Sequence, residues 1–162
     1  MNRAALRDAP RPDDRTAIRR LVETAGVFSP AEVAIACELI DERLARGLAA
    51  SGYHFLFAEE GRGQPLGYAC YGPIPLTQGS WDLYWIAVDA GQRGRGIGRR
   101  LMAEVERRAA AAGASALFID TSGRTDYGAA RAFYASLGYR IAAEFPDFYA
   151  PGDAKVVFRK NL

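Results

Sequence analysis

Apolar residues recur at helical spacing near the start of the chain. A helix is predicted over residues 14–25, and Gly26 is placed to end it, because glycine adopts the left-handed backbone that follows many helices. The other positions of this segment are mainly charged, so one face should be buried and the other solvated. The apolar face comprises Ala17, Ile18, Leu21 and Val22.

A second helix is predicted to begin at Pro30. Ser29 and Glu32 have the spacing of a capping box, in which each side chain accepts a hydrogen bond from the backbone of the other residue. Gly47 is expected to end this helix. The buried face should comprise Val33, Cys37, Ile40 and Leu44.

The rest of the chain alternates between strand-like and helix-like segments. Short Gly/Pro-rich turns between strands favour antiparallel pairing, whereas a strand, a helix and a strand in succession imply a parallel pair with a right-handed crossover. The pattern predicts an α/β fold with a mixed sheet. The predicted strands are residues 53–59, 66–71, 82–88, 116–121, 139–144 and 155–160, with helices over 101–112 and 127–137, and residues 4–6 offer only a weak first strand.

Composition narrows the class of protein. The 162 residues fit one domain, spanning 1–162, that is long enough to bury a core. With 49% hydrophobic and 25% charged residues, the chain is typical of a soluble globular protein rather than of a disordered or membrane protein. A net charge of +2 is too balanced to indicate a nucleic-acid partner.

The sequence contains no clear secretory signal and no spacing typical of a metal site. Residues 1–12 lack the apolar core of a secretory signal, which predicts a cytoplasmic protein. Cys37 and Cys70 lie in apolar patterns and are interpreted as small buried residues in a reducing compartment. His54 is the only histidine, and no Cys/His/carboxylate spacing indicates a metal, so we expect a structural histidine and no metal site.

A run rich in glycine and arginine, residues 92–100, separates the strand 82–88 from the next helix. Such a turn leaves backbone N–H groups free at the positive end of the helix dipole, so it should bind a phosphate-bearing ligand. The dinucleotide fingerprint does not fit, since Arg99 or Leu101 holds its third glycine position. The Gly-Lys-Ser/Thr of a P-loop is also missing.

The remaining pattern, Arg93-x-x-Gly96-x-Gly98, resembles the acyl-coenzyme A pyrophosphate loop of the GCN5-related N-acetyltransferase (GNAT) superfamily. The order of predicted elements is similar to that of the family over nearly the whole chain. The resemblance implies a GNAT-like fold, with a mostly antiparallel central sheet, one splayed parallel pair and about four flanking helices. It also implies direct attack of an amine on acetyl-coenzyme A in a ternary complex.

The resemblance further implies which residues hold the cofactor. Backbone N–H groups of Ile86, Ala87 and Val88 should bind the pantetheine arm and polarise the thioester carbonyl. Tyr127 stands where many members have a cofactor-binding asparagine, which leaves that contact open. The pyrophosphate contacts are expected from Arg93, Gly94, Arg95, Gly96, Ile97, Gly98 and Arg99.

Two residues match catalytic positions of the family. Tyr134 matches a tyrosine near the coenzyme A sulfur, and a phenol stays protonated at neutral pH, so it can stabilise a leaving thiolate. A tyrosine that merely packs has the same pattern. Asp82 matches the general-base glutamate of histone-type members, although an aspartate that starts a strand looks alike. Its ordinary pKa near 3.9 makes it a weak base unless burial raises that pKa, and Tyr84 or an ordered water is the alternative base.

Side-chain periodicity predicts the faces on which these residues lie. Strand alternation divides residues 81–88 between two faces. On the later helix, Phe133 and Leu137 should share the core-facing side, with Tyr134 about a quarter turn away. One face of the strand should carry Asp82, Tyr84, Ile86 and Val88, and the other Trp81, Leu83, Trp85 and Ala87.

The acceptor should contact the irregular segments 71–75 and 145–153, which prolines stiffen. Asp147 or Asp153 is available for a cationic amine. The aromatic side chains there would equally suit a lid over the core or a dimer contact. Homodimers are common in the family, but no stripe of this sequence indicates one. The expected substrate residues are Tyr71, Trp81, Tyr84, Phe148 and Tyr149.

The leading interpretation is an N-acetyltransferase that uses acetyl-coenzyme A to modify a primary amine of a small amino-acid-like or polyamine-like molecule. Neither a nucleic acid nor a membrane is expected as partner. Two alternatives remain. One is a non-catalytic module that senses or binds acyl-coenzyme A, and the other is an acetyltransferase for protein lysines or N-termini.

Overall fold

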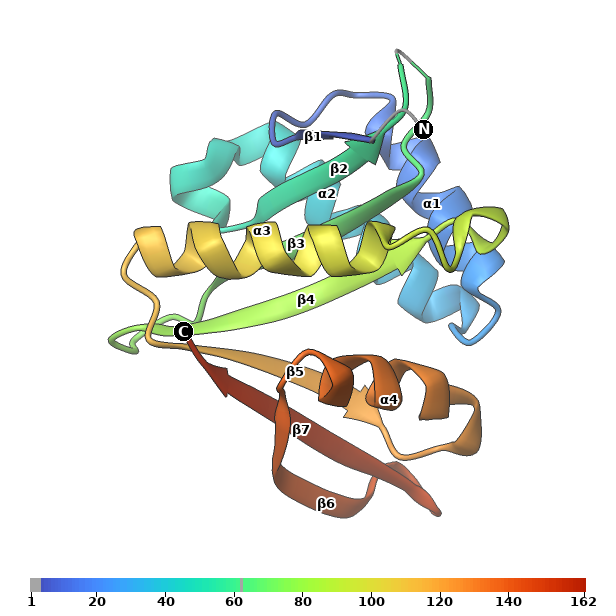
Figure 1. The fold of residues 1–162 in the computed structure, drawn as a ribbon, viewed down its shortest axis with the longest axis vertical. Coiled ribbons are helices and arrows are strands. Elements are labelled where there is room, and N and C mark those ends of the chain that lie inside the picture. The colour runs from blue at the N-terminus through green and yellow to red at the C-terminus, as the bar shows by residue number, and fades with distance from the viewer. Residues whose placement is uncertain (1–3, 62) are drawn as a thin grey trace.

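Seven strands form one sheet in the computed structural model, which describes residues 4–61 and 63–162 (Figure 1). The order across the sheet is β1-β2-β3-β4-β5-β7-β6, and β4 and β5 form the parallel pair while the other neighbours are antiparallel. The predicted mixed sheet is therefore confirmed. The strands are β1 (Ala5–Arg7), β2 (His54–Glu59), β3 (Gly67–Pro73), β4 (Ser80–Val88), β5 (Ala116–Ser122), β6 (Arg140–Ala150) and β7 (Asp153–Asn161).

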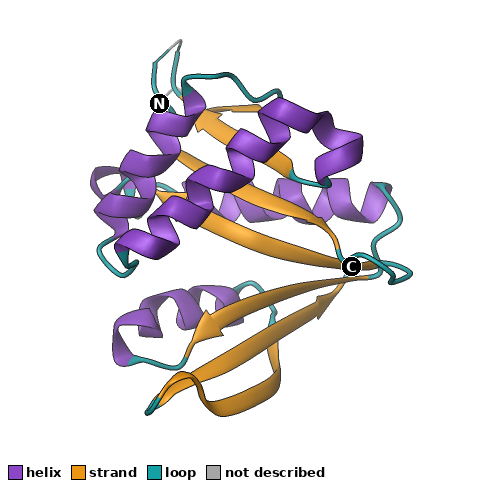
Figure 2. Ribbon diagram, turned by 180° about the vertical axis from the view of Figure 1, so that it is seen from behind, coloured by secondary structure: helices purple, strands orange, loops and turns teal. Residues whose placement is uncertain are grey.

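Helices cover both faces of the first half of the sheet. The long helix α3 (Ile97–Ala111) crosses one face of β2, β3 and β4, while α1 (Asp14–Ala25) and α2 (Pro30–Ser51) lie on the other (Figures 1 and 2). Helix α4 (Gly128–Ser136) packs on the same face as α3, beside the second half of the sheet. Two apolar clusters result, one under α3 and α4 and one under α1 and α2. Among the described residues, no helix has the length and apolar character needed to cross a membrane.

The N-terminal helices follow most of the sequence prediction, although Leu44, expected on the buried face of the second helix, is 39% exposed. Helix α1 has the predicted bounds, and both hydrogen bonds of the Ser29–Glu32 capping box are present. Gly47 ends the first helical stretch of α2, as predicted, but it does not end the whole element. Gly47 takes a left-handed φ of 77° and interrupts α2, but the chain resumes a helical course to Ser51. A glycine permits such a break, and the residues that follow decide whether the helix continues.

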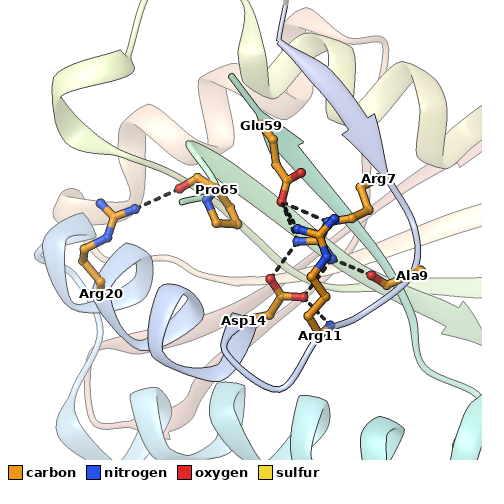
Figure 3. Close-up of polar contacts among 7 residues, drawn as sticks. All are labelled: Arg7, Ala9, Arg11, Asp14, Arg20, Glu59 and Pro65. Atoms are coloured by element: carbon orange, nitrogen blue, oxygen red, sulfur yellow. Dashed lines mark hydrogen bonds and ion pairs between the residues drawn. The ribbon is translucent and has the colours of Figure 1, made fainter. Parts of the chain in front are cut away.

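Ion pairs of Arg7 fix the short strand β1 to its neighbours. The Arg7 guanidinium lies 2.7 Å from Asp14 at the start of α1 and 2.6 Å from Glu59 at the end of β2 (Figure 3). Its carbon also lies 4.4 Å from the ring centre of Phe57. Because Asp14 and Glu59 are almost fully buried, this cluster joins β1, β2 and α1 in a way that the three-residue apolar pattern alone does not explain.

The C-terminal hairpin is longer than predicted. Strand β6 extends to Ala150, so the expected irregular loop over 145–153 was wrong, and only Pro151 and Gly152 lie between the strands. Pro146 is tolerated because β6 is the edge of the sheet, where a missing N–H removes no interior ladder bond. Asp147, with φ 54°, marks the irregular register between Phe145 and Ala150.

A β-bulge reverses the facing of side chains along β4. Cys70 of β3 pairs with Trp85 and Tyr71 pairs with Leu83, so Tyr84 is an extra residue. The predicted strict alternation was therefore wrong beyond Leu83. Under α3 lie Trp81, Leu83, Ile86 and Val88, whereas Tyr84, Trp85 and Ala87 pack in the cluster under α1 and α2.

Candidate active site

The parallel strands β4 and β5 separate half way along their length. Residues 80–83 of β4 pair with residues 116–119 of β5, and the pairing ends at Leu83 and Ile119. Residues 85–88 keep their partners on β3, the bulged Tyr84 has none, and all five lack a partner on β5. Figures 1 and 2 show the two halves of the sheet turning away from each other beyond this point. The predicted splay is confirmed, and it leaves backbone polar groups of β4 free to bind a ligand.

The free edge of β4 leads into the glycine loop. After the short 3₁₀ helix Ala90–Gln92, Gly94 and Gly96 adopt left-handed φ values of 79° and 75°, and α3 begins at Ile97. The helix thus starts four residues before the predicted Leu101. The N–H of Arg100 donates to the carbonyl of Gly96 at 3.1 Å, so the three preceding helical N–H groups have no partner within the helix. They point out at the positive end of the helix dipole.

Gly98 serves a different purpose from the two glycines before it. A Cβ at Gly98 would lie 3.2 Å from Cζ of Phe133 on α4, whereas a Cβ at Gly94 or Gly96 would meet nothing within 4 Å. The first two glycines are needed for backbone conformation, and the third allows α4 to approach the start of α3. The loop motif therefore also sets the position of the helix that carries Tyr134.

The arginines of the loop have different surroundings. Arg95 lies 3.2 Å from the carboxylate of Glu60, and Arg99 donates to Oγ of Ser136 on α4 at 3.0 Å. Within the described part of the chain, Arg93 is exposed and has no ion pair or side-chain hydrogen bond. Its charge is the one most available to an anionic ligand.

Contacts from outside the loop brace its first turn. Oδ1 of Asp89 accepts a hydrogen bond from the N–H of Gly91 at 2.9 Å, and its other oxygen forms an ion pair with Arg20 of α1. The same guanidinium donates to the carbonyl of Pro65 at 2.8 Å (Figure 3). The ion pair, together with the Gly91 bond, lowers the pKa of Asp89. Helix α1 is thereby connected to the turn that begins the loop.

Asp82 lies at the point where β4 and β5 separate. Its neighbours Trp81 and Leu83 face α3, so Asp82 faces the opposite side of the sheet, where it is half-buried. Burial raises the pKa of Asp82 to about 6; the charge of Asp120 adds to the shift and Lys155 opposes it. A carboxylate with such a pKa is a far better base at neutral pH than an ordinary aspartate. Burial, and next the charge of Asp82, raises the pKa of Tyr84 to about 12.

Tyr134 is the buried residue of α4. It packs in the cluster under α3, with its ring 5.7 Å from that of Phe158, while Phe133 and Leu137 are only partly buried. The predicted facing of this helix was therefore wrong, because α4 turns Tyr134 toward the core. Burial raises the pKa of the phenol well above its ordinary value of 10. The group is a proton-bearing hydrogen-bond donor at any physiological pH.

The five expected substrate residues do not all lie together. Tyr71 and Trp81 are 1% and 6% exposed and pack under α3, so the expectation that they contact an acceptor is corrected. Tyr84 lies near Asp82 on the other face. Phe148 and Tyr149 are exposed on β6, and their rings contact each other edge to face.

Tyr127 lies in the short 3₁₀ helix Thr125–Tyr127 and is partly buried. Its ring is 6.0 Å from that of Phe28, between α1 and α2, and 5.2 Å from the carbon of the Arg124 guanidinium. Phe28 in turn contacts Trp85 of β4 at 4.9 Å. A row of aromatic side chains therefore connects the loop after α1 with the end of β5.

Two residues near Asp82 were not predicted. Asp120 of β5 and Lys155 of β7 form an ion pair of 2.7 Å on the same face. Strand alternation from Phe118 would have placed Asp120 on this side, but no local pattern connects Lys155 with it, since the contact depends on how β7 inserts beside β5.

Other surface features lie apart from these residues. A hollow of about 490 Å³ is lined by Gly138, Arg140, Ile141, Ala142, Arg159, Lys160 and Asn161, and a smaller one of about 180 Å³ by Arg19, Glu23, Phe28, Pro30 and Val33. Neither contains a predicted site residue. In the described ranges, 4–61 and 63–162, no three His, Cys, Asp or Glu residues are grouped as metal ligands. His54 packs between the rings of Tyr71 and Trp81.

Comparison with known proteins agrees with this geometry. The model of the acetyltransferase (GNAT) family matches residues 18–139. Blasticidin-S acetyltransferase from Streptomyces morookaense is 40% identical over 95 residues, which cover 56% of this chain and 65% of that protein, slightly under two thirds of its length. A GNAT-family protein from Desulfovibrio desulfuricans is 44% identical, with a TM-score of 0.94 over 98% of both chains. An aminoglycoside 6′-N-acetyltransferase in complex with coenzyme A has the same fold at 17% identity, with a TM-score of 0.75 over 97% of this chain and 96% of that one.

A mixed sheet that splits beside a glycine-rich helix start defines a class of acyl-coenzyme A-dependent transferases. The chain belongs to the GNAT family of N-acetyltransferases.

Proposed function

We propose that this protein transfers an acetyl group from acetyl-coenzyme A to a primary amine of a small molecule, by direct attack in a ternary complex. The observation that carries the proposal is the end of β4–β5 pairing at Leu83 and Ile119, directly before the glycine loop. The opening exposes the edge of β4 to an extended pantetheine arm. The loop supplies free N–H groups for the pyrophosphate at the end of that arm.

The cofactor contacts follow from this arrangement. Ile86, Ala87 and Val88 would bind the pantetheine arm through their backbone, and an N–H group there would polarise the thioester carbonyl. Arg93 would add charge beside the free N–H groups at the start of α3. Tyr127, placed near the end of β5, would line the cofactor with its ring. The pyrophosphate would be held by residues 93–99.

Asp82 and Tyr134, on opposite faces of the sheet, would act as the base and as the hydrogen-bond donor to the leaving group. The amine nitrogen attacks the thioester carbonyl carbon, and Asp82 takes the proton that the nitrogen loses. The C–S bond then breaks, and the Tyr134 hydroxyl donates a hydrogen bond to the departing thiolate. An ordinary thiol has a pKa near 8.5, far below that of the buried phenol, so Tyr134 stabilises the thiolate without surrendering its proton.

The first test is calorimetric titration with acetyl-coenzyme A and with its desulfo and dephospho analogues. We expect binding that Arg93→Met weakens about three- to tenfold, as for loss of one charge-assisted contact. Arg46→Met is the control, since Arg46 is also an exposed arginine and lies on α2, where it pairs with Glu42. No binding of acetyl-coenzyme A would overturn the proposal. Release of free thiol with a panel of amines then tests turnover.

A panel without turnover but with tight cofactor binding would favour a sensor of acyl-coenzyme A. Acetylation of a protein N-terminus or lysine in place of small amines would favour the protein-modifying alternative. The environment of Asp82 favours an enzyme over a sensor. Burying a carboxylate beside another carboxylate lowers stability, and a binding module would gain nothing from that loss.

A further inference from the structure

The acceptor side of the opening already holds a cation, supplied by the chain itself. Lys155 of β7 places Nζ 2.7 Å from Oδ2 of Asp120 and 4.9 Å from the ring centre of Phe148. A carboxylate and an aromatic face are the groups that commonly bind an ammonium in proteins. Lys155 therefore shows that an ammonium group fits between these two side chains.

Asp120 occupies a particular position in the sheet. Ile119 is the last residue of β5 that pairs with β4, and Asp120 is the next one. Asp82 pairs with Phe118, so Asp82 and Asp120 lie on the same face, diagonally across the two strands. The charge of Asp120 also raises the pKa of Asp82, in agreement with their closeness on this face. The ammonium site is thus one short chain length from the proposed base.

The Lys155–Asp120 pair is suited to exchange. The two side chains are 23% and 48% exposed, and ion pairs of such exposure add little stability because water solvates both partners. Lys155 ends a flexible four-carbon stem, so it can leave Asp120 without moving β7. Once it leaves, the carboxylates of Asp82 and Asp120 share this face with Arg159, whose guanidinium carbon lies 5.8 Å from the ring centre of Phe118. That arrangement favours a ligand with two positive charges.

We infer that the acceptor is a diamine, a dication in solution, whose reacting amine lies at Asp82 and attacks in its neutral form after releasing its ammonium proton to water, and whose second ammonium replaces Lys155 between Asp120 and Phe148. This inference rests on the proposed acetyl transfer and specifies its substrate class. The two amines should be joined by a short carbon chain. Asp120 is then a specificity-determining residue that does not touch the reacting atoms. When no acceptor is bound, Lys155 occupies the position of the acceptor's second ammonium.

The test compares 1,5-diaminopentane with pentylamine, which shares its carbon chain but carries one amine. Both are titrated calorimetrically into the protein saturated with coenzyme A at neutral pH. The measured quantity is the ratio of the two affinities, because changes at Asp82 affect both ligands, while the Asp41→Asn control detects nonspecific attraction, which acts more strongly on the doubly charged ligand. We expect the native protein to bind the diamine at least about fivefold more tightly.

Two variants and a control test which residues cause the preference for the diamine. Asp120→Asn should reduce the affinity ratio to about one, whereas Lys155→Met should increase it several-fold, because the internal competitor is gone. Asp41→Asn is the matched control and should leave the ratio unchanged. Asp41 is 46% exposed and forms an ion pair of 2.9 Å with Arg15, away from the site.

Each contrary result has a defined meaning. Equal affinity for the two amines, or no affinity for either in the coenzyme A-loaded protein, overturns the dication inference. So does a preference that survives Asp120→Asn. In these cases the binding of coenzyme A in the same sample leaves the proposed acetyl transfer standing. If coenzyme A itself does not bind, the proposed function fails.

Discussion

Arg20 on α1 forms an ion pair with Asp89, the residue that joins β4 to the glycine loop. Asp89 in turn accepts the hydrogen bond from Gly91 that closes the first turn of the loop. The proposed phosphate site thus depends on a helix at the other end of the sequence. Because Arg20 does not belong to the loop, its contribution is one of positioning.

Arg20→Met is expected to raise the KM for acetyl-coenzyme A about fivefold with little change in kcat, since a partly exposed ion pair contributes about 1 kcal/mol. Arg20→Lys should restore part of the affinity, because lysine can reach Asp89 but has no second group for the Pro65 carbonyl. Steady-state kinetics measure both. Arg15→Met is the control on the same helix, since Arg15 pairs with Asp41 instead. Equal effects of Arg15→Met and Arg20→Met would contradict the positioning role.

Gly96→Ala and Gly98→Ala should both destabilise the protein, for different reasons. At Gly96 the left-handed backbone, with φ 75°, costs a non-glycine residue about 1–2 kcal/mol, although a methyl group has open space. At Gly98 the backbone is ordinary and the methyl group meets Phe133 at 3.2 Å. Phe133→Leu should therefore rescue Gly98→Ala and not Gly96→Ala. Denaturant unfolding of the single and double variants measures the coupling, and rescue of both would refute this division.

Asp82→Asn should abolish most turnover and yet stabilise the fold. Loss of a general base lowers kcat/KM about 10²- to 10⁴-fold. The native pKa of about 6 lies above the ordinary 3.8, so folding favours the protonated carboxyl. Stability should fall as pH rises from about 4 to about 6 and stay low above that. The half-exposed carboxyl is screened by water, so we expect a gain of about 1 kcal/mol at neutral pH. A loss of stability in Asp82→Asn would indicate a structural aspartate.

The pKa of Asp82 also predicts how activity should fall at acidic pH. In the native protein, kcat/KM should fall about tenfold per pH unit below about pH 6, because Asp82 must be unprotonated to accept the amine proton. Asp120→Asn should move this limb to lower pH, since the Asp120 charge raises the pKa of Asp82. An activity that stays constant from pH 7 to pH 5 would exclude Asp82 as the base.

Tyr134→Phe should lower kcat about 10- to 100-fold while the affinity for acetyl-coenzyme A stays within about twofold, because the hydroxyl acts only when the thiolate forms. Tyr68→Phe provides the control. Its hydroxyl is also buried and has no hydrogen-bond partner among the described residues, but it lies in the cluster under α1 and α2. A fall in cofactor affinity without a fall in kcat would assign Tyr134 to binding.

Local sequence patterns predicted most elements and the glycine loop. Helix α1, the capping box of α2 and five of the predicted strands depend on neighbouring residues, whose spacing is visible in the chain. The loop was equally readable, because positive φ values at Gly94 and Gly96 are a local requirement. The length of β6 could not be predicted from local sequence, since the extent of an edge strand depends on its pairing with β7.

The sequence by itself determined the order of helices and strands, the glycine-rich turn proposed to bind phosphate and the identity of two candidate catalytic residues. Only the tertiary structure decided the surroundings of these residues. The Tyr84 bulge reverses the facing of β4, the packing of α4 buries Tyr134, and β7 brings Lys155 to Asp120. The reason is physical: backbone conformation follows from neighbours in the chain, whereas burial, pKa and side-chain partners depend on residues that only folding brings together.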